Sequence, residues 1–126
     1  MPTFTITRTL QTANVKAYTN SALAPAGLTL VRGTLDVPAA DVTDPTTDCE
    51  VGVEQAPAGT SDAEWPSVAR RVAAVGLLGN PANDPAQMPF FELGATTLAA
   101  LAGRRVRGYL LTRTAGKQVG ATLEVT

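Results

Sequence analysis

The sequence predicts an all-β protein: a single antiparallel β-sandwich domain over residues 1–126, jelly-roll-like or immunoglobulin-like, with about seven or eight strands and at most one short helix. Apolar and polar residues alternate with a period of two in at least five segments, as in strands buried on one face. Stretches rich in Pro and Gly separate these segments. With 44% hydrophobic and 17% charged residues, the composition suits one globular domain rather than a disordered chain.

The first strands follow from this alternation. In TFTITRTL, residues 3–10, Phe4 and Ile6 lie on one face and threonines on the other, which predicts a strand. NVKAYT is a shorter second candidate before a turn-rich segment. In LTLVRGTLDV, residues 28–37, the apolar phase shifts, and this indicates a bulge around Val31 to Gly33.

The segment DCEVGVEQ, residues 48–55, predicts a half-buried strand. Cys49, Val51 and Val53 share its apolar phase, and Glu50 and Glu54 point outward. Cys49 is expected to fill the core as a small hydrophobe, because its neighbours are acidic and a reactive thiolate needs a basic neighbour.

Residues 67–78, SVARRVAAVGLL, admit two interpretations. Their valines have helical spacing, with Pro66 suited to a first helical turn. The same residues also alternate as a strand, and we favour the strand because Gly76 and Gly79 follow and the neighbouring segments are β.

The last third of the chain predicts a loop, two further strand regions and one helical turn. The loop is followed by a short FFEL strand and by ATTLAALAG, a turn of helix capped by Thr96 or Thr97 and stopped by Gly103. RRVRGYLLTRT and QVGATLEVT, joined by AGK, predict a terminal hairpin. The predicted core comprises Phe4, Ile6, Leu30, Leu35, Val51, Val53, Val106, Leu110, Leu123 and Val125.

The composition also excludes several kinds of chemistry. The chain has no His, so catalytic triads with His, His general bases and His metal sites are ruled out. No nucleophile motif or Gly-rich phosphate loop is present. We therefore expect no enzyme and no cofactor; a small hydrolase using the acidic loops is the least favoured hypothesis. The net charge of −1 argues against general nucleic-acid binding.

No apolar stretch approaches the ~20 residues of a membrane span, and the N-terminus lacks the features of a secretory signal. Acids in the region from Asp41 to Glu50 could hold Ca²⁺, but Pro45 interrupts them and their spacing is not that of an EF-hand. Solvated loop acids and Asx turns are the favoured interpretation, and Ca²⁺ binding stays open.

Charge is unevenly distributed along the chain. Eight acids and no base lie between Gly33 and Ala69, whereas seven bases and two acids lie between Arg70 and Lys117. The two lobes either neutralise each other within the fold or meet between subunits, where complementary charge sets orientation. We predict that the acidic Asp36–Glu64 region and the basic Arg70–Arg113 region occupy different surfaces and that at least one of them meets a neighbouring subunit. The candidate interface residues are Arg104, Arg105, Arg107, Arg113, Asp41, Asp44, Asp62 and Glu64.

The middle of the chain suggests one alternative function. Trp65, with Tyr18 and Tyr109, could form a stacking platform for a sugar, as in carbohydrate-binding modules. Aromatic residues make up only 5% of the chain, which favours ordinary packing for Trp65 and makes this the second hypothesis.

Several features together resemble small β-sandwich virion proteins of tailed bacteriophages. They are the Thr-, Ala- and Val-rich strands, the Val51, Val53, Glu54 and Trp65 pattern, and the terminal GRRVRGYLLTR…VGATLEV segment. The resemblance implies a non-enzymatic structural protein, most readily a capsid decoration subunit, with a head fibre, tail or collar component as the alternatives. It implies location in the virion after assembly in the host cytoplasm. The implied partners are further copies of the chain and other virion proteins, the major capsid protein among them, with no nucleic acid or membrane.

Overall fold

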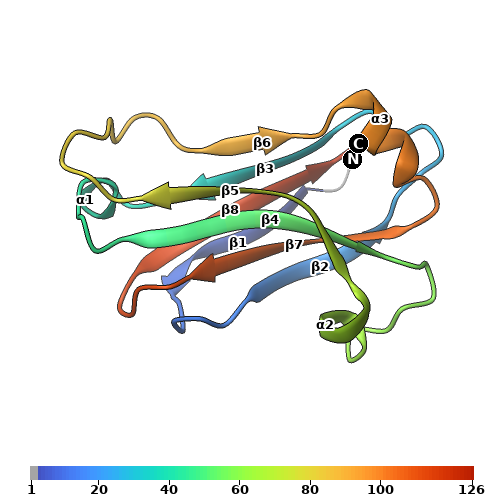
Figure 1. The fold of residues 1–126 in the computed structure, drawn as a ribbon, viewed down its shortest axis with the longest axis horizontal. Coiled ribbons are helices and arrows are strands. Elements are labelled where there is room, and N and C mark those ends of the chain that lie inside the picture. The colour runs from blue at the N-terminus through green and yellow to red at the C-terminus, as the bar shows by residue number, and fades with distance from the viewer. Residues whose placement is uncertain (1–2) are drawn as a thin grey trace.

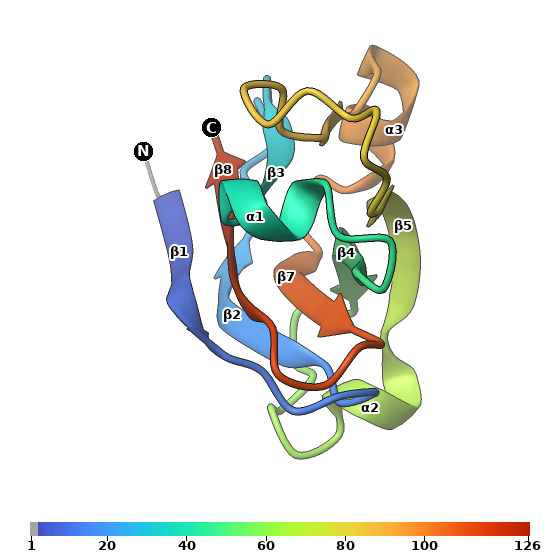
Figure 2. The ribbon, with the colours of Figure 1, turned by 90° about the vertical axis from the view of Figure 1, so that its left-hand side faces the viewer.

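The computed structural model describes residues 3–126, which form two four-stranded antiparallel sheets packed face to face (Figure 1). The strand order of sheet A is β1-β8-β3-β6, and that of sheet B is β2-β7-β4-β5. Figure 2 shows the two layers from one end. The predicted all-β sandwich of seven or eight strands is confirmed. The strands are β1 (Thr3–Leu10), β2 (Ala17–Leu23), β3 (Val31–Asp36), β4 (Asp48–Ala56), β5 (Arg70–Leu78), β6 (Phe90–Glu92), β7 (Arg105–Thr112) and β8 (Gln118–Val125).

Three short helices connect strands, where at most one was predicted: α1 (Ala39–Val42), α2 (Trp65–Val68) and α3 (Ala95–Ala100). The first two are single turns beside a proline, a length at which periodicity gives no signal. For α3, the expected cap at Thr96 or Thr97 is wrong, because Gly94 is the N-cap residue and makes no side-chain cap. The positive φ of 77° at Gly103 agrees with a glycine that ends this region.

The ambiguous segment contains both predicted structures in succession. α2 takes the first residues, with Pro66 in its first turn, and β5 follows from Arg70. The preferred strand is therefore confirmed for residues 70–78, and the helical reading holds for the residues just before them.

The predicted terminal hairpin is wrong, because β7 lies in sheet B and β8 in sheet A. The chain turns at Gly116, with φ of 81°, and crosses from one layer to the other. The apolar side chains of the two strands consequently face each other across the core: Val106 and Leu110 from one side, Leu123 and Val125 from the other. In a hairpin these rows would have lain side by side on one sheet.

The bulge predicted around Val31 to Gly33 is also wrong. β3 pairs with β8 without a shift of register from Val31 to Asp36. The change of apolar phase arises because Leu28 lies in the turn before the strand. Register shifts occur instead in β1, in β2 and between β4 and β5.

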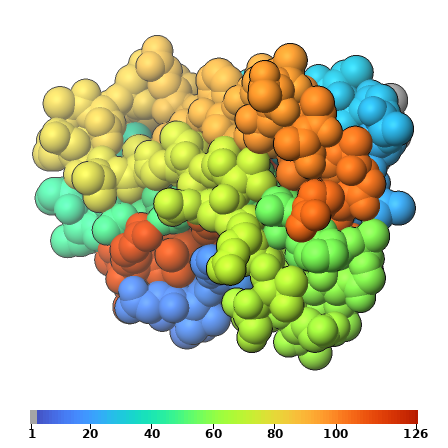
Figure 3. All heavy atoms as spheres, turned by 45° about the vertical axis from the view of Figure 1, so that its right-hand side comes forward, coloured from blue at the N-terminus to red at the C-terminus, as the bar shows by residue number. Residues whose placement is uncertain are grey.

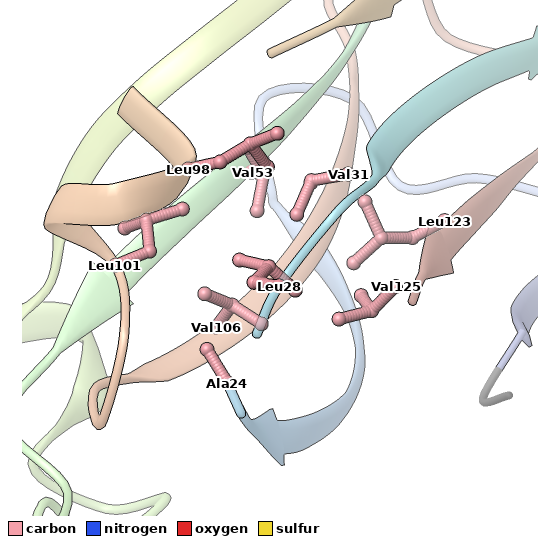
Figure 4. Packing of buried hydrophobic residues seen from close by; sticks show 9 residues of the cluster. All are labelled: Ala24, Leu28, Val31, Val53, Leu98, Leu101, Val106, Leu123 and Val125. Carbon is pink, nitrogen blue, oxygen red and sulfur yellow. The ribbon is translucent and has the colours of Figure 1, made fainter. Parts of the chain in front are cut away.

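The core lies between the sheets in two clusters, one of which Figure 4 shows. In that cluster Leu98 of α3 and Leu101, the residue that follows α3, pack against Val53 and Val106 at one end of the sandwich. Cys49 is fully buried in the other cluster, as predicted. Most of the predicted core is confirmed, but Phe4 and Ile6 on edge strand β1, and Leu30 before β3, are only half-buried. The predicted residues that are buried are Leu35, Val51, Val53, Val106, Leu110, Leu123 and Val125.

Candidate functional site

The outer face of sheet B carries the most organised polar cluster in the described part of the chain. Alternation along β4 puts Cys49, Val51 and Val53 in the core and directs Glu50, Gly52 and Glu54 to the outer face. The outward orientation of the two glutamates was predicted, but their solvent exposure was not. They are only 8% and 4% exposed, so other side chains cover this face.

Tyr109 of β7 lies flat across β4 at Gly52. A Cβ atom on Gly52 would come within 2.4 Å of the tyrosine ring, so only glycine leaves space for it. In this position the Tyr109 hydroxyl donates a hydrogen bond of 2.6 Å to Glu50 Oε2. Burial and the adjacent Glu50 carboxylate raise the pKa of Tyr109, which keeps its proton on the hydroxyl.

Each oxygen of the two buried glutamates has a partner. Arg113 binds Glu50 Oε1, and Trp65 Nε1 donates to Glu54 Oε1 at 2.9 Å. Lys16 Nζ donates to Glu54 Oε2 at 2.6 Å and lies 4.5 Å from the centre of the Tyr109 ring. Burial alone would raise the pKa of Glu50, but the hydrogen bonds from Tyr109 and Arg113 outweigh it and lower the pKa.

A groove of about 400 Å³ opens above these residues. Residues of β5 form one wall, and in Figure 3 the yellow-green β5 segment runs along the front of the molecule beside blue and red atoms from other parts of the chain. The lining includes four cationic side chains and two carboxylates. The lining residues are Lys16, Glu50, Glu54, Ala69, Arg70, Arg71, Tyr109, Leu111 and Arg113.

The aromatic residues proposed as a sugar platform lie in or beside this cluster, but they offer no free face. Trp65 is 0% and Tyr109 1% exposed. Tyr18 is half-buried beneath Arg107, whose guanidinium lies 4.7 Å from the Tyr18 ring centre and 5.7 Å from that of Trp65. The stacking platform is therefore wrong as predicted, because stacking needs an exposed ring face.

The prediction that acidic and basic lobes occupy different surfaces is also wrong. Acidic β4 lies between β5 and β7, which carry arginines, so the lobes meet inside one sheet. The acidic and basic segments are far apart in the sequence, so their contact could not be predicted from it. Strand order follows from pairing between distant segments. The ion pairs include Arg113 with Asp48 and Glu50, Lys117 with Asp41 and Asp44, Lys16 with Glu54, and Arg107 with Asp62.

The other candidate interface residues also bind neighbours in the same chain. Arg104 contacts Gln55, and Arg105 Nε donates to the Ser21 hydroxyl at 3.1 Å. Glu64 Oε1 accepts hydrogen bonds from the backbone and hydroxyl of Ser61. A contact of any of these residues with another subunit stays a prediction.

The carboxylates of Asp41 and Asp44, which were considered as Ca²⁺ ligands, also bind groups of the same chain. Lys117 Nζ lies 3.2 Å from Asp41 Oδ1 and 2.8 Å from Asp44 Oδ2. Asp44 Oδ1 accepts from the backbone N–H of Thr46, which is the predicted Asx turn. Within residues 3–126, no group of three or more Cys, Asp or Glu side chains is placed to hold a metal ion.

Sequence reasoning missed the groove, although it named Tyr109 and Arg113 as candidate site residues and Glu50 among the acids that could hold Ca²⁺. The cations that it missed are Lys16, Arg70 and Arg71. The available signal for a groove was the presence of small residues on two strands, Gly52 on β4 and Ala74 and Gly76 on β5. The pairing of β4 with β5 brings these residues together. Beyond Val53 the register shifts, because Val72 of β5 is skipped and Arg71 lies opposite Glu54, and no local pattern shows this shift. Within the described residues, no helix has the length and apolarity needed to cross a membrane.

The strand pairing defines the class of protein as an antiparallel β-sandwich. No protein-family model and no curated protein matches the sequence. Solved structures give weak likenesses, and a relationship to tailed bacteriophages stays a proposal.

Three of these structures belong to different kinds of protein. The xylan-binding module CBM15 matches over 96% of this chain and 74% of its own, with 11% identity and a TM-score of 0.44. A structure of Desmodium yellow mottle tymovirus matches over 98% and 82%, with 10% identity and a TM-score of 0.41. Xylanase 10C from Cellvibrio japonicus matches over 98% and 22%, with 10% identity and a TM-score of 0.45.

Proposed function

We propose that the protein is a non-enzymatic structural subunit that works by contacts with further copies of itself, as a capsid decoration subunit does. The observation that carries the proposal is the free edge of sheet B, formed by β5. Within the described residues β5 pairs only with β4, so its other side presents unpaired backbone donors and acceptors.

Two arginines and a register shift protect the start of the β5 edge, but the stretch from Val72 to Leu78 lacks charge and proline. Natural edge strands are commonly short, charged or interrupted by proline. β5 has nine residues, and from Val72 to Leu78 it contains neither a charge nor a proline. A strand of this kind favours pairing with a second copy, in which the same edge meets itself about a two-fold axis.

Exposed apolar side chains lie close to this edge in the chain. Leu78, which ends β5, is 72% exposed, and Phe90, which begins β6, is 51% exposed. They flank the loop that joins β5 to β6. Because most charged residues are paired within the fold, association depends mainly on apolar burial and backbone pairing.

The experiment compares the mass of the protein with that of edge variants by sedimentation velocity. Ala74 and Leu78 are both exposed on β5, so Ala74→Lys with Leu78→Lys adds charge to the edge without disturbing the core. We expect the natural chain to sediment as an oligomer and the double variant as a monomer. Leu23→Lys, on the opposite edge strand β2 and 62% exposed, is the matched control and should leave the oligomer intact.

A monomeric natural chain, or an oligomer that survives both lysines, would contradict assembly through β5. The location in a virion is tested separately, by mass spectrometry of purified virus particles from the source of this sequence. Recovery in a fixed ratio to the major capsid protein supports a decoration role, and absence from pure particles contradicts it.

A further inference from the structure

We propose that the groove on the outer face of sheet B is a binding site for a small ligand that carries an oxyanion group, such as a carboxylate, sulfate or phosphate. Arg70 and Arg71, at the start of β5, belong to this groove, whereas the edge proposed for assembly is the uncharged stretch of β5 from Val72 to Leu78. Some charges in the groove are neutralised by partners of the same chain, and others are not.

The carboxylates in the groove are committed to partners of the same chain. Glu50 binds Tyr109 and Arg113, and Glu54 binds Trp65 and Lys16. Both glutamates are almost fully buried, so neither can turn to a ligand without leaving donors unpaired. These contacts neutralise Arg113 and Lys16 in turn, and the floor of the groove is electrically balanced.

Arg70 and Arg71 add two positive charges to this balanced floor. Both residues line the groove and both are exposed, and no ion pair joins either to another described residue. Arg71 lies beside Tyr109 and Glu50, where its positive charge favours the ionised form of each. The groove therefore has a net charge of +2, from four cations and two carboxylates, although the whole chain has a net charge of −1. An oxyanion is the group that two free guanidinium groups bind best, because they can donate paired hydrogen bonds to its oxygens.

The size and rigidity of the groove indicate a small molecule. Its volume of about 400 Å³ lies at the lower end of the range for ligand pockets. The floor is held in place because Tyr109 fills the space above Gly52 and is hydrogen-bonded at its hydroxyl. Leu111 and Ala69 add a small apolar contribution to the wall. The groove therefore fits a ligand about the size of a sugar that carries one anionic group.

The test is calorimetric titration of the full chain with sodium glucuronate, sodium sulfate and, as the neutral probe, glucose. We expect saturable binding of glucuronate or sulfate and none of glucose. Binding of sulfate but not glucuronate assigns the site to inorganic or ester oxyanions, and the reverse assigns it to carboxylates. Binding of glucose as strongly as glucuronate would overturn the proposal, and so would the absence of saturable binding by every probe.

Variants then locate the site. Arg70→Gln with Arg71→Gln should weaken binding by about tenfold or more, the effect of losing hydrogen bonds to a charged group. Arg8→Gln removes an arginine from sheet A that is 49% exposed at its side chain and should leave the affinity unchanged. Equal affinity in the double variant, or an equal loss in Arg8→Gln, would show that binding is not in the groove. The edge variants of β5 keep both arginines. Loss of assembly, measured by sedimentation, can therefore be distinguished from loss of ligand binding, measured by calorimetry.

Discussion

Gly52 shows how a single residue shapes the outer face of sheet B. Most strand positions gain from a side chain, and glycine inside a strand is destabilising. Here the missing side chain makes room for the Tyr109 ring, which then reaches Glu50. The absence of a side chain at Gly52 thus allows Tyr109 of β7 to form its hydrogen bond with Glu50 of β4.

The substitution Gly52→Ala should therefore destabilise the protein by about 1–3 kcal/mol, as overpacking does in other proteins. The new methyl group would collide with the Tyr109 ring, and moving the ring would break its hydrogen bond to buried Glu50. Urea unfolding followed by tryptophan fluorescence measures the change. Gly59→Ala is the control, because a Cβ atom there meets nothing within 4 Å and should leave the stability near that of the natural chain. Equal effects at the two positions would contradict this explanation.

At the level of elements, α2 and the turn before it position Trp65 on the outer face. The turn has a Ser-x-x-Glu sequence whose side chains bond reciprocally as in a capping box, and its Glu64 is the N-cap residue of α2. The Ser61 hydroxyl accepts a hydrogen bond from the backbone N–H of Glu64, whose carboxylate accepts one from the backbone N–H of Ser61. These reciprocal bonds set the direction in which the chain enters α2, and so bring the Trp65 indole to Glu54.

Loss of the serine hydroxyl tests this role. Ser61→Ala should lower the free energy of unfolding by roughly 1 kcal/mol, the usual net effect of removing a hydrogen bond. Ser67→Ala, an exposed serine within the same helix, should have a smaller effect because no hydrogen bond of its hydroxyl is seen. Chemical denaturation of both variants makes the comparison. If Ser67→Ala were the more damaging, the turn before α2 would not depend on the reciprocal bonds.

For the whole molecule, the ion pairs that join acidic and basic segments predict how stability changes with pH. Hydrogen bonds from Lys117 and from Thr46 lower the pKa of Asp44 from its ordinary 3.8 to about 2. The pKa of Glu50 is also lowered, since its hydrogen bonds outweigh its burial. A carboxyl group whose pKa is lower in the folded state stabilises that state above its ordinary pKa.

This contribution should be complete at neutral pH and should disappear as the pH falls from about 4 to about 2. The expected result is a free energy of unfolding, measured in urea, that decreases over this interval. Asp44→Asn should be less stable than the natural chain at pH 7 and should lose less on acidification. A natural chain whose stability is constant between pH 5 and pH 2.5 would contradict the role of these ion pairs.

Local sequence patterns were sufficient for the class of fold and for most of the buried residues. Period-two alternation identifies strands such as β1, β4 and β8 because each has one face in the core. The burial of Cys49 and the Asx turn at Asp44 follow from equally local features.

Only the tertiary structure decided which strands are neighbours, and the candidate site depends on that. The order β2-β7-β4-β5 places acidic and basic strands together, separates β7 from β8, and covers Glu50 and Glu54 with residues from distant segments. Alternation reveals that a side chain leaves the core but not what meets it on the other face. Strand order and register arise from contacts between residues far apart in the chain, and the joint packing of both layers selects them.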